Sequence, residues 1–185
     1  MSHDPTRPAP WNDPPADARD PGARDPGARD PGARYAELRA ELAALIAGED
    51  DALANLANAA AAIFHTLPGL NWAGFYLLRG PELVLGPFQG RPACVRIPLG
   101  RGVCGTAAVS GESIVVPDVT AFPGHIACDS RSRAELVVPV RAGGRVVGVL
   151  DLDSPHPGRF DATDRAGCEA LAALVAPAMA ALAGA

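Results

Sequence analysis

Four cysteines are the side chains in this sequence best suited to chemistry: Cys94, Cys104, Cys128 and Cys168 in a chain of 185 residues. The N-terminus lacks the charged and then apolar layout of a secretory signal, so we expect thiols rather than a disulfide framework. A thiolate can attack an electrophilic atom, and a second thiol can convert the resulting sulfenic acid to a disulfide. Free cysteines are also often simply buried. The cysteines alone therefore leave redox chemistry and packing open.

Three carboxylates form a second candidate set. Asp151 and Asp153 alternate along an expected strand, so both side chains should emerge from one face, roughly 6.5 to 7 Å apart at their Cα atoms. Glu135 begins the preceding strand, and antiparallel pairing would bring it close. Repulsion between neighbouring carboxylates disfavours ionisation of all three, so at least one should have a raised pKa. Without further information, Asp151 and Asp153 could equally be surface acids at the end of a strand.

Two aromatic residues and one histidine complete the candidates. Trp72 and Tyr76 are four positions apart on an expected strand and so share a face, where core packing is the default alternative. His125 could lower the pKa of a thiol or bind a metal, although neither role is compelling. The cysteines lack the close spacing of a zinc site, so we expect no metal and no cofactor.

The elements that must position these residues follow a helix, sheet, helix order. Periodicity predicts helices over 35–47 and 51–66, strands over 72–78, 82–85 and 93–97, a short helix over 102–110 and a strand over 113–116. A long polar loop over 119–131 precedes a hairpin of strands 136–141 and 145–151 and a final helix over 163–183, capped by Asp161 or Thr163 and kinked at Pro177. This is an α+β fold with an antiparallel sheet.

Residues 1–34 differ from the rest of the chain. Asp-Pro-Gly-Ala-Arg is repeated from Asp20, Asp25 and Asp30, with almost nothing apolar to bury, so we predict a disordered tail rather than a docking arm. Residues 35–185 should be one domain. The net charge of −5 and the scattered arginines argue against a nucleic-acid partner. No apolar run approaches the roughly 20 residues of a membrane span, so we expect a cytoplasmic protein without a membrane partner.

Five segments carry a resemblance to a known family: NWAGFY at 71–76, GVCGTA at 102–107, PDV at 117–119, HIACDS at 125–130 and DLD at 151–153. The strand ending in GVLDLD at 148–153 resembles a GAF domain. Within that group the segments together resemble the free methionine-(R)-sulfoxide reductases, over nearly everything from Tyr35 onward. The resemblance implies a central antiparallel sheet with the N- and C-terminal helices on one side and a short helix and loops on the other.

The resemblance also implies an activity, the reduction of free L-methionine-(R)-sulfoxide to methionine. In that family cysteines occur at the positions of Cys94, Cys104 and Cys128. The loop cysteine Cys128 is the implied nucleophile, Cys94 the favoured partner that resolves its sulfenic acid to an intramolecular disulfide, and Cys104 the alternative. Thioredoxin is the implied reductant, in a role tied to oxidative stress, and a homodimer is expected from the resemblance alone. Cys168 matches nothing in the family and is assigned to packing.

The resemblance further implies a substrate pocket. Its wall would consist of Trp72, Tyr76, Ile126 and Ala127. Glu135, Asp151 and Asp153 would hold the ammonium group of the free amino acid and protonate the sulfoxide oxygen, without a division of roles among the three. Two alternatives remain: a GAF sensor that binds a small ligand without catalysis, and a thiol redox switch that would use the cysteines without the acids.

Overall fold

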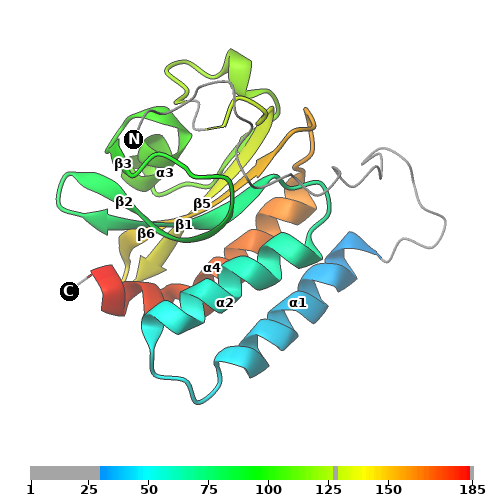
Figure 1. The fold of residues 1–185 in the computed structure, drawn as a ribbon, viewed down its shortest axis with the longest axis vertical. Helices are drawn as coiled ribbons and strands as arrows, with labels where there is room; N and C mark the ends of the chain where they lie inside the picture. Colours follow the sequence, from blue (N-terminus) through cyan, green and yellow to red (C-terminus); the bar gives the residue numbers. More distant parts are fainter. Residues whose placement is uncertain (1–29, 127–128, 184–185) are drawn as a thin grey trace, which may run out of the picture.

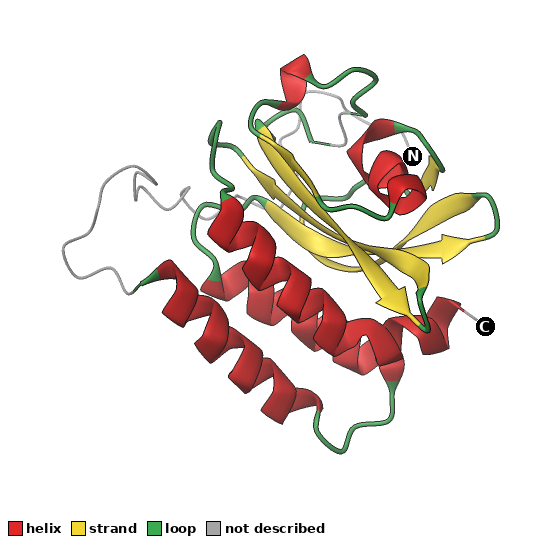
Figure 2. Ribbon diagram, turned by 180° about the vertical axis from the view of Figure 1, so that it is seen from behind, coloured by secondary structure: helices red, strands yellow, loops and turns green. Residues whose placement is uncertain are grey.

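The computed structural model describes residues 30–126 and 129–183, and within them the chain forms one antiparallel sheet between two unequal layers (Figures 1 and 2). The helices are α1 (Pro31–Ile46), α2 (Ala52–Thr66), α3 (Gly102–Ser110) and α4 (Ala162–Ala183), with a 3-10 turn, η1, at Val119–Ala121. The strands are β1 (Trp72–Arg79), β2 (Glu82–Gly90), β3 (Arg96–Pro98), β4 (Ile114–Val116), β5 (Ala134–Ala142) and β6 (Arg145–Ser154). The predicted α+β class is confirmed.

The sheet has the strand order β3-β2-β1-β6-β5-β4, so the first and last hairpins of the sequence meet at its centre. Trp72 on β1 lies opposite Asp153 on β6, and Glu135 on β5 lies opposite Asp153 from the other side. This register places one aromatic residue and the predicted acids on adjacent strands. The predicted hairpin with its turn at Gly143 and Gly144 is present, and it provides the β5 and β6 side of this arrangement.

Three long helices, α1, α2 and α4, cover one face of the sheet (Figure 2). The apolar spacing that predicted α2 places Leu56, Ala60 and Ile63 on its buried side, but Leu53, at the same spacing, is exposed. Asp161 caps α4 by accepting from the backbone N–H of Thr163 and Asp164. By length and hydropathy α4 could cross a membrane, contrary to our expectation that no segment would. In this fold its apolar side, including Leu171 and Met179, is fully buried against the sheet and helices.

The first helix begins at Pro31, inside the segment predicted to be a disordered tail. The third Asp-Pro-Gly-Ala-Arg repeat of that segment forms the start of the helix. Asp30 accepts a hydrogen bond from the backbone N–H of Gly32, and the proline that follows Asp30 suits the first helical turn. The boundary therefore lies four residues earlier than the predicted helix start at Tyr35. Residues 1–29 lie outside the described residues, and the prediction of disorder there stays a prediction.

The opposite face of the sheet carries α3 and the loops around it (Figures 1 and 2). A second apolar cluster forms there, separate from the core under the long helices. The segment at 93–97 forms a strand only from Arg96, and the predicted long loop contains η1. Among the described residues, Cys94 and Cys104 lie on this face together with the predicted acids and aromatic residues.

Candidate active site

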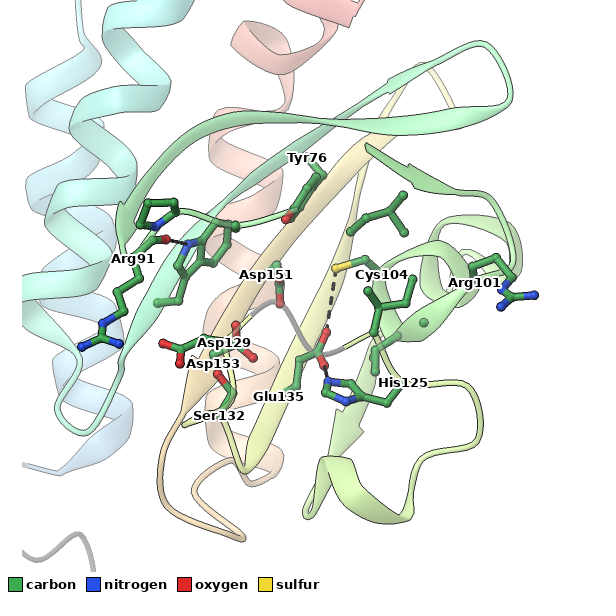
Figure 3. Close-up of a pocket in the computed structure, with 17 residues that line it drawn as sticks. Tyr76, Arg91, Arg101, Cys104, His125, Asp129, Ser132, Glu135, Asp151 and Asp153 are labelled. Atoms are coloured by element: carbon green, nitrogen blue, oxygen red, sulfur yellow. Dashed lines mark hydrogen bonds and ion pairs between the residues drawn. The ribbon is translucent and has the colours of Figure 1, made fainter. Parts of the chain in front are cut away.

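A pocket opens between α3, the β2–β3 loop and the ends of β1, β5 and β6 (Figure 3). Of the residues proposed from the sequence, those that line it are Trp72, Tyr76, Cys104, Ile126, Glu135, Asp151 and Asp153. The sheet register is the cause, since Glu135 on β5 is paired with Asp153 on β6, and Asp151 lies two residues from Asp153 on the same face. The three carboxylates, Glu135, Asp151 and Asp153, all line this one pocket.

Trp72 and Tyr76 form one wall of the pocket and are both almost fully buried. Their rings stack with centroids 5.8 Å apart, and the ring of Phe88 stacks with that of Trp72 at 5.4 Å. Gly74 makes this possible, because a Cβ at that position would lie 2.7 Å from the indole and 2.4 Å from the Cβ of Phe88. The glycine of the NWAGFY segment is therefore a packing requirement of the wall.

Both aromatic residues also donate hydrogen bonds to the β2–β3 loop. The indole N–H of Trp72 donates to the carbonyl of Arg91 at 3.2 Å, and the Tyr76 hydroxyl donates to the carbonyl of Cys94 at 3.1 Å. From the sequence these two residues were candidates for the substrate wall, with core packing as the alternative. The structure adds another role, since their hydrogen bonds tie the backbone that carries Cys94 to this wall of the pocket.

The three carboxylates differ from ordinary surface acids in being buried. Burial is the main cause that raises the pKa of Glu135 to about 7, with the neighbouring Asp153 adding to it and His125 opposing it. Burial likewise raises the pKa of Asp151, reinforced by Glu135, and that of Asp153, reinforced by Asp151. Each acid thus raises the pKa of another, as expected for crowded carboxylates. Protons, or a cation from outside, must offset this charge.

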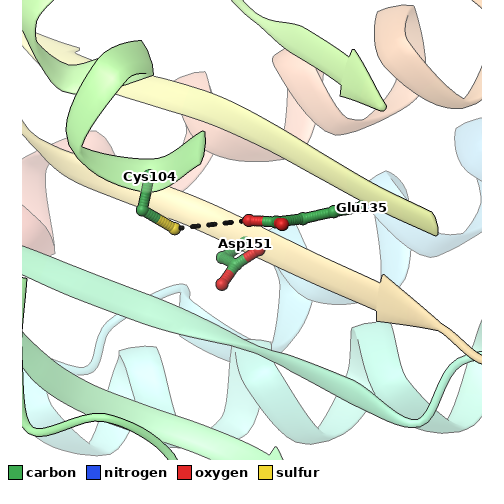
Figure 4. Close-up of side chains that lie close together, drawn as sticks. All are labelled: Cys104, Glu135 and Asp151. Carbon is green, nitrogen blue, oxygen red and sulfur yellow. Dashed lines mark hydrogen bonds between the residues drawn. The ribbon is translucent and has the colours of Figure 1, made fainter. Parts of the chain in front are cut away.

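Cys104 faces the same carboxylates from α3 (Figure 4). Its Sγ donates to Oε1 of Glu135 at 3.8 Å, and burial together with Asp151 and Glu135 raises its pKa well above the usual value. A thiol in that environment resists ionisation and is a poor nucleophile. Cys104 is a hydrogen-bond donor within the acid cluster, which weakens its case as the resolving residue.

Asp129 and Ser132 line the pocket and Asn71 supports them, although none of the three was selected from the sequence. His125 was considered as a partner of a thiol or a metal, and its Nε2 lies instead 3.6 Å from Oε2 of Glu135. Asn71 donates to Ser132 at 3.0 Å and to Asp129 at 3.3 Å, and so links the start of β1 to the loop before β5. Asn71, His125 and Asp129 do occur in the segments that carried the family resemblance, which was the available signal.

The remaining cysteines are distributed differently. Cys94 is partly buried against the apolar cluster on the pocket side, in the β2–β3 loop. Cys168 is fully buried in the other core, 3.8 Å from the Tyr35 hydroxyl, which agrees with its assignment to packing. Ala127 and Cys128 lie outside the described residues, so the predicted nucleophile is not placed. Their described neighbours Ile126 and Asp129 both line the pocket.

Comparison with known proteins identifies the fold and its relatives. A family profile described as GAF domain matches residues 50–179. The free methionine-R-sulfoxide reductase of Escherichia coli is 51% identical over 139 residues, covering 75% of this chain and 84% of the relative. The Saccharomyces cerevisiae protein of the same name is 45% identical over 136 residues, covering 69% and 76%.

A solved structure agrees with this fold over almost its whole length. The X-ray structure of free methionine-R-sulfoxide reductase from Neisseria meningitidis, in complex with its substrate, superimposes with a TM-score of 0.79 at 47% identity. It covers 84% of this chain and 95% of the other. The similarity therefore extends over most of the sheet and the elements that pack on its two faces.

Proposed function

The chain belongs to the GAF domain family and, within it, to the free methionine-R-sulfoxide reductases, and on that premise we propose that its acid-lined pocket binds free methionine-(R)-sulfoxide for reduction by a cysteine thiolate. The observation that carries this proposal is the burial of Glu135, Asp151 and Asp153 around one cavity next to a wall of stacked aromatic rings. Such a cavity offers negative charge and apolar surface side by side.

The acids suit the ammonium group that a free amino acid carries and a methionine within a peptide lacks. Among the described residues, the ion pair that these three carboxylates make is the one between His125 and Glu135. Oδ1 of Asp151 is buried and has no hydrogen-bond partner within the described part of the chain. A buried oxygen without a hydrogen-bond donor lowers the stability of the folded protein, and a donor on a bound ligand would supply the missing hydrogen bond. The indole of Trp72 would contact the terminal methyl group.

The proposed reaction transfers oxygen from the substrate to sulfur of the enzyme. The Cys128 thiolate attacks the sulfoxide sulfur while an acid protonates the oxygen; methionine leaves, reduced by two electrons, and Cys128 is oxidised to a sulfenic acid. Glu135 is the best-suited proton donor, because an acid with a pKa of about 7 is partly protonated at neutral pH. A second thiol then displaces the oxygen as water and forms a disulfide, which an external dithiol such as thioredoxin reduces by exchange.

Cys94 is the proposed resolving thiol. It lies in the β2–β3 loop that Trp72 and Tyr76 hold against the pocket. Cys104, the alternative, is buried, hydrogen-bonded to Glu135 and hard to ionise. The loop position of Cys94 and the burial of Cys104 favour Cys94 for attack on a sulfenic acid. Cys104 is then a hydrogen-bond donor to the acids.

A stereospecific assay tests the reaction. NADPH oxidation through thioredoxin reductase and thioredoxin should be seen with free methionine-(R)-sulfoxide, and not with the (S) epimer, a peptide-bound sulfoxide or the N-acetylated amino acid, which lacks the ammonium. Equal turnover of the N-acetylated compound would contradict the role given to the acids. No turnover of any sulfoxide would favour a sensor or a redox switch.

Single cysteine replacements test the assignments. Cys128→Ser should abolish methionine formation, and activity that persists would remove it as nucleophile. Cys94→Ser should still form about one equivalent of methionine and accumulate a sulfenic acid that dimedone traps, whereas Cys104→Ser should still form the disulfide. Cys168→Ser is the matched control in the opposite core and should behave as the wild type. Trapped sulfenic acid in Cys104→Ser instead would reverse the two roles.

Replacement of one acid tests the binding pocket. Asp153→Asn should raise KM for methionine sulfoxide by about tenfold or more, since a charged hydrogen bond contributes roughly 1.5 to 3 kcal/mol. The surface pair of Asp118 and Arg133 provides a control, because Asp118→Asn lies outside the pocket and should leave KM unchanged. Reduced thiols and a thioredoxin partner also suit a cytoplasmic location, which is part of the proposal.

A further inference from the structure

Cys104, Glu135 and Asp151 form a buried cluster whose ligand atoms all lie within 4.8 Å of one another. The three come from α3, β5 and β6, so only the assembled sheet brings them together (Figure 4). A thiol that donates to a carboxylate is an ordinary contact, and so is a pair of acids. Thiolate sulfur and carboxylate oxygen are both ligands that zinc accepts in proteins, so these three side chains offer it three donor atoms within reach of one position.

We propose that this cluster is a binding site for a zinc ion, which competes with substrate for the pocket and holds the enzyme inactive. Zinc bonds thiolate sulfur at about 2.3 Å and carboxylate oxygen at about 2.0 Å, so sulfur and oxygen across a tetrahedral ion are about 3.5 Å apart. The Sγ of Cys104 and Oε1 of Glu135 are 3.8 Å apart. Little movement is needed to take up the ion.

A second observation points to a ligand at the same place. Oδ1 of Asp151 is buried and, within residues 30–126 and 129–183, accepts no hydrogen bond. The Asp151 side chain lines the pocket and lies near the sulfur of Cys104 (Figures 3 and 4). A zinc ion would supply the missing partner and would neutralise the two carboxylates that now face each other. The thiol proton would be released to solvent on binding.

The surroundings favour zinc over harder cations. Mg²⁺ and Ca²⁺ select oxygen ligands only, whereas a thiolate suits zinc. His125 contacts the other oxygen of Glu135 through Nε2 at 3.6 Å, the arrangement by which a histidine orients a ligating carboxylate (Figure 3). A pocket lined by Asp151 and Asp153 cannot hold the ion and the substrate ammonium together, so binding of either should exclude the other. Only this competition rests on the proposed function.

Cobalt spectroscopy tests the site without reference to activity. Protein freed of metal by EDTA and kept reduced by a phosphine should take up one Co²⁺ per chain and show a thiolate-to-cobalt charge-transfer band, which Zn²⁺ abolishes by displacement and Mg²⁺ does not. Cys104→Ser should lose the band and Cys168→Ser should keep it. A wild-type protein without the band, or a band that survives in Cys104→Ser, would overturn the proposal.

Two further variants distinguish the three-ligand site from metal binding by the loop cysteines. The double variant Cys94→Ser with Cys128→Ser lacks the thiols of the proposed reaction and should keep the band; its loss would mean that the loop cysteines bind the metal. Asp151→Asn retains every thiol and should weaken zinc binding more than about tenfold in calorimetry. Unchanged affinity would refute the three-ligand site. Unfolding curves of each variant verify that it is folded.

Competition with substrate separates this proposal from the proposed function. Free methionine sulfoxide should raise the apparent Kd for zinc, and zinc should block single-turnover methionine formation until EDTA is added. If zinc binds through Cys104 and substrate does not compete, the metal site stands and the placement of the ammonium in this pocket fails. If methionine forms at an unchanged rate with zinc saturating, the inhibitory role is wrong while the reductase function stands.

Discussion

Replacement of Glu135 by glutamine should stabilise the protein above neutral pH while it lowers activity. Burial raises the pKa of this carboxyl from 4.5 to about 7, so the folded state holds its proton more tightly than the unfolded state does. The stability therefore falls as pH rises from about 4.5 to about 7, and the loss is complete above that window. A rise of this size corresponds to a penalty of up to about 3 kcal/mol.

The glutamine amide carries no charge and escapes this penalty. Glu135→Gln should therefore match the wild type near pH 4 and exceed it by up to about 3 kcal/mol in the free energy of unfolding at pH 8. Urea unfolding across this pH range measures the difference. The exposed Glu112→Gln is the surface control and should change stability by less than about 0.5 kcal/mol at every pH. A glutamine variant that is less stable at pH 8, or a difference that does not change with pH, would refute the reasoning.

Three other substitutions test particular contacts. Tyr76→Phe removes the hydrogen-bond donor to the β2–β3 loop and should slow resolution of the sulfenic acid by about fivefold or more, measured by dimedone trapping. The first equivalent of methionine should form at the normal rate. Equal slowing of both steps would argue against a positioning role. Tyr35→Phe removes a buried hydrogen bond to Asp164 and should cost about 1 to 3 kcal/mol in urea unfolding with kcat/KM unchanged. Gly74→Ala drives a methyl group into Phe88 and should cost about 1 to 3 kcal/mol; a neutral effect would contradict the packing of the aromatic wall.

The elements themselves were largely predictable because their signals are local. The apolar spacing of α2, the Gly-flanked α3 and the turn at Gly143 and Gly144 all correspond to elements that the structure contains. Errors occurred where a local signal was ambiguous. Asp30 and Pro31 were assigned to a disordered repeat although they also make a helix start. The span of α4 was predicted to within one residue, but its high mean hydropathy was not recognised.

The amino-acid sequence by itself determined which residues could do chemistry, because thiols, acids and strand alternation are properties of residue type and spacing. It also predicted that Asp151 and Asp153 share a face. Only the tertiary structure decided what Cys104 and His125 do, since each meets Glu135 from an element distant in sequence. The raised pKa values have the same origin: burial and the approach of other charges depend on the packing of α3 over β5 and β6, which no local pattern encodes.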